Sequence, residues 1–211
     1  MFCRNCGREL SEDIEFCPGC GAQVMKRENA EAVAVGLQNK LRIGNGRVII
    51  VSIASYGLYL FYWFYLTWKQ IKVATGRKDY HPVWHALALL VPIYSLFIVY
   101  RHMQTIKDLA AKGGVTTSLS PGGTLTLFIV SSVLVWTSAR ASLYGTELLG
   151  VMLVVDIIST VIMAGMLLWA QTSLNKCWNK VSKGQIRDAP LGVGEVVIVL
   201  IGLLLWATYL L

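Results

Sequence analysis

Charged residues are scarce in this chain of 211 residues: only 15% are Asp, Glu, Lys or Arg, and the acidic residues number 12. Hydrophobic residues make up 55% of the chain, and the mean hydropathy is +0.56. A soluble globular domain carries about 25% charged residues. The composition therefore argues against a soluble domain and predicts an integral membrane protein.

The sequence also lacks the motifs of the common catalytic and nucleotide-binding sites. It has no P-loop, no Gly-rich dinucleotide turn and no nucleophile placed beside a base. Histidine is rare, and His81, His85 and His102 have no cysteine or carboxylate cluster around them. We therefore expect no enzymatic activity, no second metal site at these histidines, and no catalytic or cofactor-binding residue.

Cysteine is uncommon, but four of the five cysteines form a pattern at the start of the chain: Cys3, Cys6, Cys17 and Cys20 make two CxxC pairs. Two such turns facing each other complete a tetrahedral Cys₄ site, the usual structural zinc arrangement. About 25 residues cannot bury enough apolar surface to fold unaided, so the metal must supply most of the folding energy. The pattern predicts a small β zinc ribbon over residues 1–25. With all four ligands from protein, the zinc is structural.

Two other readings of the cysteines remain open, namely disulfide pairs and a redox CxxC, although no βαβ pattern surrounds either pair. The net charge of +7 raises the question of nucleic acid. Residues 1–27, however, carry four basic and four acidic residues and are therefore neutral. Phosphate binding needs a basic patch, so we expect no nucleic-acid partner.

Beyond the ribbon, the sequence predicts an all-α membrane domain over residues 47–211. Residues 26–46 form a linker whose apolar spacing predicts an amphipathic helix over 28–42, lying against the membrane or the ribbon; a solvated linker is the alternative. Each of five apolar segments has about the length that crosses a bilayer. These segments are 48–68, 83–100, 122–139, 148–170 and 191–211.

The basic residues between the segments indicate an orientation. Thiolates that hold zinc must stay reduced, which favours a cytosolic N-terminus. If all five segments cross, loop 171–189 is cytosolic and the C-terminus is outside, as the positive-inside rule requires. The loop after the first segment, with Lys69, Lys72, Arg77 and Lys78, then lies outside and breaks the rule once.

The first two segments resemble each other: residues 56–62 align with residues 94–100, 38 positions later. Both copies contain a possible helix break, at residues 55–57 and at Pro92. Consecutive spanning helices run antiparallel, which is unusual for a direct repeat whose basic end comes last both times. Either both segments span the bilayer, or each is a re-entrant hairpin that enters and leaves on the cytosolic side, at the cost of a backbone break in lipid.

Residues 45–115 resemble a prokaryotic membrane family, domain of unknown function 4234, whose members often carry an N-terminal zinc ribbon. The resemblance rests on Gly57, Tyr59, Tyr62, Trp63 and Lys69, with Leu58 in place of the usual isoleucine. It implies a multi-span protein of a prokaryotic plasma membrane. The family carries no established activity, so the resemblance implies no mechanism.

Three residues of the apolar segments and their flanks could carry chemistry. Asp156 lies about 12 Å into the fourth segment, with Arg140, Ser131, Ser132 and Thr137 as possible partners; it is either a functional carboxylate or one that fastens two helices. Glu195 is expected at the membrane interface near Lys183 or Arg187. Cys177 is either a palmitoylation site among basic residues or an inert interface residue.

Three functions follow as hypotheses. The first is a binding, adaptor or regulatory module in which the ribbon recruits a cytosolic protein to the membrane. The second is a small transporter or channel subunit that uses Asp156, although solute pathways usually need several intramembrane polar groups. The third is a membrane enzyme, for which the sequence offers no catalytic residues. The composition predicts the lipid bilayer as a partner, the first hypothesis adds a cytosolic protein, and the sequence leaves the oligomeric state open.

Overall fold

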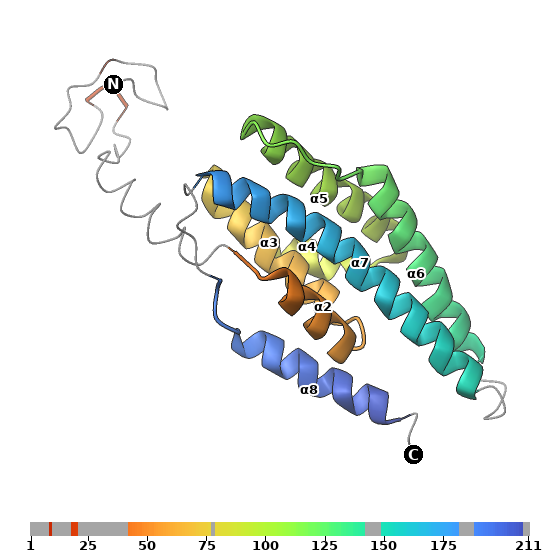
Figure 1. Ribbon diagram of the computed structural model, residues 1–211. Coiled ribbons are helices and arrows are strands. Elements are labelled where there is room, and N and C mark those ends of the chain that lie inside the picture. The colour runs from red at the N-terminus through yellow and green to blue at the C-terminus, as the bar shows by residue number, and fades with distance from the viewer. Residues whose placement is uncertain are drawn as a thin grey trace.

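The computed structural model describes residue 9 and residues 18–20, 42–76, 79–141, 149–181 and 188–208. Most of the predicted ribbon (1–25) and linker (26–46) therefore lies outside the described residues. The rest is helical: α2 (Asn45–Ala54), α3 (Tyr59–Thr75), α4 (Pro82–Leu87), a 3-10 turn η1 (Ala88–Leu90), α5 (Pro92–Lys112), α6 (Pro121–Ala141), α7 (Leu149–Val181) and α8 (Val193–Ala207). Figure 1 shows these helices as one elongated bundle along α7.

α6 and α7 form the long antiparallel pair of the bundle. Pro121 begins α6, and the Ser120 hydroxyl accepts a hydrogen bond from the amide of Gly123 at 3.1 Å, which caps the helix. Halfway along, the hydroxyls of Ser131 and Ser159 lie 2.8 Å apart and join the two helices. Small hydroxyl side chains of this kind let membrane helices approach closely and bond.

Two helices of the described residues are long and apolar enough to cross a membrane: Pro121–Ala141, with hydropathy 1.5, and Leu149–Lys180, with hydropathy 2.4. The core helix of a soluble protein would be mostly buried. Here only 22% and 39% of the two apolar windows are buried within the protein. Their exposed apolar surface is therefore compatible with lipid and agrees with the predicted membrane association.

The prediction of five continuous apolar segments is not supported, because the first segment (48–68) is broken. α2 ends at Ala54 after ten residues, and α3 begins at Tyr59. Between them Tyr56 (φ 56°) and Gly57 (φ 80°) adopt left-handed backbone conformations that a helix does not contain. The break reverses the chain.

The second segment (83–100) is broken as well, at Val91. A residue that precedes proline is disfavoured in the helical region, and Val91 is extended (φ −95°, ψ 108°) directly before Pro92. The last segment (191–211) begins later than expected: α8 has 15 residues from Val193 to Ala207. Only the third and fourth segments are thus unbroken helices of spanning length.

Hydrogen bonds along α7 fix the direction of the other helices. Asn45, at the start of α2, bonds to Asn175 and Thr172, whereas Tyr56, after its end, bonds to Asp156. α2 is therefore antiparallel to α7. α3 returns the opposite way, because the indole of Trp63 reaches Gln171 at 2.8 Å.

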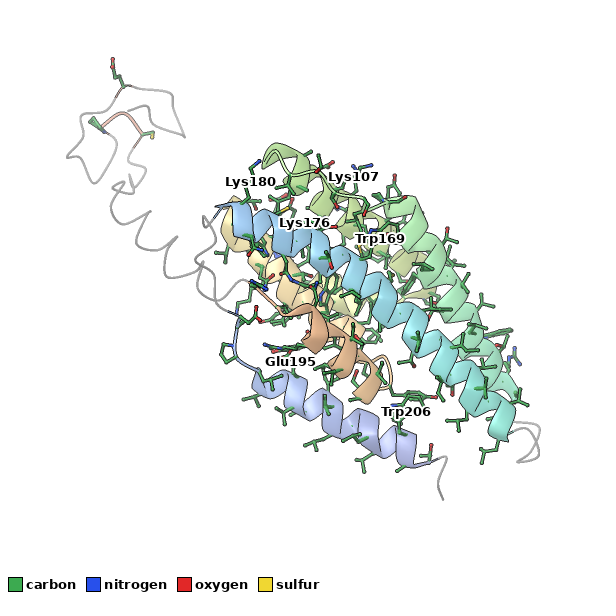
Figure 2. The ribbon with its side chains drawn as sticks, viewed as in Figure 1. Lys107, Trp169, Lys176, Lys180, Glu195 and Trp206 are labelled. Carbon is green, nitrogen blue, oxygen red and sulfur yellow. The ribbon has the colours of Figure 1, made fainter. Side chains whose placement is uncertain are left out.

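Hydrogen bonds and an ion pair also place α5 beside α7 and α8 beside α2. α5 ends beside the C-terminal part of α7, where the Lys180 ammonium bonds to the carbonyl of Gly114 at 2.7 Å. α8 runs parallel to α2: Glu195 meets Arg47, and the Trp206 indole donates to the carbonyl of Ile53 at 2.8 Å. Figure 2 shows Glu195 and Trp206 at the two ends of α8.

One end of the bundle, which we name the basic end, collects the lysines of the C-terminal parts of α3, α5 and α7. Figure 2 shows Lys107, Lys176 and Lys180 there. The basic end is defined by Lys69, Lys72, Lys107, Lys112, Lys176 and Lys180, which are all the lysines of the described residues. The opposite end, where α6 finishes and α7 begins, has Arg140 as its basic residue in the described part of the chain.

Candidate metal site and buried polar contacts

Of the four predicted zinc ligands, the structure describes Cys20, an exposed residue in the turn at residues 18–20. Cys3, Cys6 and Cys17 lie outside the described residues. The donor set fits zinc by its chemistry, since four thiolates at CxxC spacing fill a tetrahedral shell and leave no open position. The described residues contain no group of three or more His, Cys, Asp or Glu side chains that could hold a metal ion.

The structure favours the inert reading of Cys177 over the palmitoylation site. Its side chain is 3% exposed within the C-terminal part of α7. A thiol must reach solvent or the lipid interface to accept an acyl group. Cys177 is therefore packed in the protein, where free cysteine behaves as a small apolar residue.

Asp156 has a partner that the sequence analysis missed. Asp156 is 4% exposed, and its carboxylate accepts a hydrogen bond from the hydroxyl of Tyr56, in the turn between α2 and α3. Of the expected partners, Arg140 lies over the ring of Trp136 at 4.9 Å, and Ser131 bonds to Ser159. Ser132 and Thr137 bond to carbonyls of their own helix.

Glu195 was expected at the interface near Lys183 or Arg187, but it is fully buried and paired with Arg47 of α2. Its carboxylate also accepts hydrogen bonds from the hydroxyl of Tyr59 at 3.1 Å and from the backbone amide of Gly192 at 2.8 Å. The last bond caps α8. One side chain thus joins α2, α3 and α8, because a carboxylate has lone pairs for several donors.

A ladder of side-chain amides continues this buried polar layer along α7. Gln171 accepts the indole proton of Trp63 and donates to Asn175 at 2.9 Å, and Asn175 donates to the carbonyl of Ile43 at 2.8 Å. Gln171 is fully buried and Asn175 is 7% exposed. The spacing of four residues, two amides in one apolar helix, is the sequence signal that could have found them.

His102 of α5 is enclosed by the aromatic side chains of α3. Its ring lies 4.6 Å from that of Phe64 and 4.6 Å from that of Trp68, and the hydroxyl of Thr67 is 2.9 Å from its Nε2. Burial, with a smaller contribution from the neighbouring His85, lowers the pKa of His102 to about 3. His102 is therefore a neutral ring at physiological pH.

These contacts fasten helices to one another. Each buried carboxylate of α7 and α8 is engaged, Asp156 by a phenol and Glu195 by a guanidinium, and the two occupy different parts of the bundle. A proton or ion pathway needs several polar groups in a row that can exchange their partners. Buried and bonded groups of this kind are typical of fixed helix packing.

Comparison with known proteins supports the N-terminal prediction. The chain matches no curated protein and no solved structure. The resemblance of residues 45–115 to domain of unknown function 4234, and a prokaryotic origin, are not confirmed by these comparisons. Residues 2–24, which include all four patterned cysteines, match the family model of the zinc-ribbon domain, so the chain carries a zinc-ribbon domain ahead of its helices.

Proposed function

We propose that the protein is a membrane-anchored zinc-ribbon module that acts by binding, and that its ribbon recruits a cytosolic protein to the membrane face. The observation that carries this proposal is the zinc-ribbon match at residues 2–24 on a chain with two helices of spanning length. A small rigid domain tethered to a bilayer confines its partner to that surface, which raises the effective concentration there.

The zinc in this proposal is structural and is held by Cys3, Cys6, Cys17 and Cys20. Four thiolates leave no position for water, so the metal has no means to activate a nucleophile. This chemistry supports binding over catalysis. The balanced charge of residues 1–27 supports a protein partner over nucleic acid, because phosphate contacts depend on a basic surface.

The proposal places the ribbon and the basic end on the cytosolic side of the plasma membrane. Reduced thiolates are stable in the cytosol. The lysines that end α5 and α7 are at the same end of the bundle as residue 42, where the chain arrives from the linker. Cytosolic lysines agree with the positive-inside rule. The transporter alternative has less support, because Asp156 is engaged by Tyr56.

The proposal is tested by charge exchange on the ribbon of the full-length protein. The variant carries Arg8→Glu, Glu12→Lys and Asp13→Lys, and proximity labelling from the ribbon end identifies cytosolic proteins near the native chain and the variant. We expect the labelling of a specific cytosolic protein to be at least tenfold weaker with the variant than with the native chain, while membrane insertion of the variant is unchanged.

The matched control exchanges charges at the basic end instead, with Lys107→Glu and Asp108→Lys. This control should keep the partner. A chain without residues 1–27 that still labels the same protein as strongly as the native chain would contradict the proposal and direct attention to Asp156.

A further inference from the structure

The two broken segments give their returning helices, α3 and α5, the same direction, and the two helices meet at His102. Phe64 and His102 are 38 residues apart and so hold the same position in the sequence repeat, and their rings are in contact at 4.6 Å. Thr67 and Thr105, another equivalent pair, each donate to the carbonyl four residues earlier at 2.7 Å. The repeat in the sequence is thus a repeat in the structure.

Parallel neighbouring helices cannot both be consecutive spans, because the chain between them must first return across the bilayer. The return is made by α4 and η1, which together run from Pro82 to Leu90. Nine helical residues cover about 14 Å, about half of a 30 Å hydrocarbon core. α4 also lies near the basic end, since His85 stacks on Trp68 of α3 at 4.4 Å.

The first hairpin has the same depth. α2 has ten residues, about 15 Å, before the chain reverses at residues 55–58. In the returning helix α3, Lys69 comes ten residues after the first residue, Tyr59. In the returning helix α5, Arg101 comes nine residues after the first residue, Pro92. Both arms therefore regain a basic residue after about 14–15 Å, half of the hydrocarbon thickness.

Large apolar side chains are exposed around both turns. Ile50 is 68% exposed beside the first turn, and Leu90, Ile93 and Phe97 are 66%, 75% and 67% exposed beside the second. α6, α7 and α8 also expose large apolar side chains, with Val133, Val151 and Leu204 more than half exposed. Exposed apolar surface of this extent needs a partner, and acyl chains already cover α6 and α7 if these span.

We propose that α2–α3 and α4–α5 are two re-entrant hairpins that enter the bilayer from the basic end, reach about half its depth and return. Lipid acyl chains surround the turn of each hairpin. The lysines of both hairpins then join those of α7 on one side of the membrane, and the positive-inside rule holds without the exception that five spans required. The basic end meets the headgroup layer of that side.

The breaks themselves are compatible with lipid because their backbone groups are bonded. In the first turn the amides of Tyr56, Gly57 and Leu58 donate to the carbonyls of Ile53, Ser52 and Ser55 at 3.0–3.1 Å. The Ser55 hydroxyl accepts from the amide of Tyr59 at 3.0 Å. In the second turn Val91 donates to Ala88 at 3.2 Å, and Pro92 has no amide proton. Non-helical backbone is costly in lipid when its groups are unpaired.

The first test is cysteine labelling from outside intact cells, in a full-length chain with Cys177→Ser. Thr75→Cys lies at the end of α3 and Asp79→Cys in the connection between the hairpins. Thr116→Cys marks the basic end, and Thr146→Cys marks the α6–α7 connection. An impermeant maleimide should label Thr146→Cys in intact cells and the other three only after permeabilisation. Labelling of Thr75→Cys or Asp79→Cys from outside would overturn the hairpins, because it would mean that α3 spans.

The second test measures the surroundings of the turns in reconstituted vesicles. At Ile50→Cys and Leu90→Cys, lipid-soluble oxygen should enhance the relaxation rate of the spin label at least fivefold more than a water-soluble nickel complex does. A label at Asp108→Cys should show the reverse. Relaxation by nickel at the turns would show contact with water. Exclusion of both reagents would show a protein cover. Either result would overturn the proposal that acyl chains surround the turns.

Discussion

Two arginine–carboxylate pairs differ in their contact with water. Arg47 and Glu195 have side chains that are 15% and 1% exposed, whereas those of Arg42 and Asp188 are 40% and 54% exposed. Water screens an exposed pair, and its net contribution is about 0–1 kcal/mol. Removing one partner of a buried pair leaves an uncompensated charge, which costs about 3–5 kcal/mol.

We therefore expect Glu195→Gln to destabilise the folded protein by about 3 kcal/mol and Asp188→Asn by less than about 1 kcal/mol. For a chain of this length these losses correspond to a fall in Tm of roughly 6–12 °C and less than about 4 °C. Thermal unfolding of both variants in the same detergent measures the difference. Equal shifts in the two variants would contradict the burial of the Glu195 pair.

The buried imidazole of His102 makes stability depend on pH. Its pKa is about 3 in the folded protein and returns to about 6.5 in the unfolded chain. Between these values the unfolded state binds more protons, so stability is full above pH 6.5 and is lost as pH falls. The loss approaches about 1.4 kcal/mol per pH unit.

His102→Gln should flatten this slope between pH 6.5 and 5, and the exposed His81→Gln should leave it unchanged. Melting temperatures of the native chain and both variants over this range test the prediction. All three chains carry the same ribbon, so any acid release of zinc cancels in the comparison. A native-like slope in His102→Gln would show that other groups cause the pH dependence.

The partners of the buried carboxylates lay beyond what the sequence could predict. Tyr56 and Asp156 are 100 residues apart in the chain, and Arg47 and Glu195 are 148 apart. No local spacing relates such positions, because their contact depends on how α2, α7 and α8 pack. The sequence identified Asp156 and Glu195 as carboxylates within apolar segments. Their partners, Tyr56 and Arg47, became visible only in the folded structure.

At the scale of elements, we expect the ribbon and the helices to obtain their stability from different sources. A domain as small as the ribbon is expected to depend on its metal, whereas the helices bury Trp63, Phe64 and Trp68 with no exposed surface. We expect one zinc per chain and expect Cys17→Ser to lose it. Cys177→Ser, a thiol-to-hydroxyl change outside the ribbon, should keep it. Metal analysis of the purified variants measures the zinc.

Chelation should then unfold the ribbon and leave the helical signal in circular dichroism nearly unchanged. A chain that binds zinc equally well with Cys17→Ser would contradict the Cys₄ site. A loss of most helical signal on chelation would show that the helices also depend on the metal.

Element boundaries were predictable where a residue type dictates the backbone. Pro92 and the Tyr56–Gly57 pair mark breaks that the structure contains, and Pro121 is the first residue of α6. Hydropathy could not show that the breaks divide the segments, because it averages over a window of 18 residues, which is longer than α2 and the following turn together. For this reason the composition suggested five spans, whereas two helices have spanning length.

At the scale of the whole molecule, the bundle has a direction that sets the side of each terminus. α8 runs from the level of Arg47 near the basic end and passes the first turn, where Gly202 packs against the backbone of Ser55 and five further residues of the helix follow. We expect a periplasmic-type reporter fused after Leu211 to be active outside and a cytosolic reporter there to be inactive. The same reporters fused before Met1 should give the opposite result, and a C-terminal fusion active only in the cytosol would contradict this direction.

The half-depth hairpins have a mechanical consequence for the bilayer. All the helices add cross-section to the leaflet at the basic end, whereas only α6, α7 and α8 extend towards the other leaflet. A body that is wider in one leaflet acts as a wedge and expands that monolayer relative to the other. With the topology proposed above, the protein would favour membrane that bulges towards the ribbon side and would avoid membrane that bulges the other way.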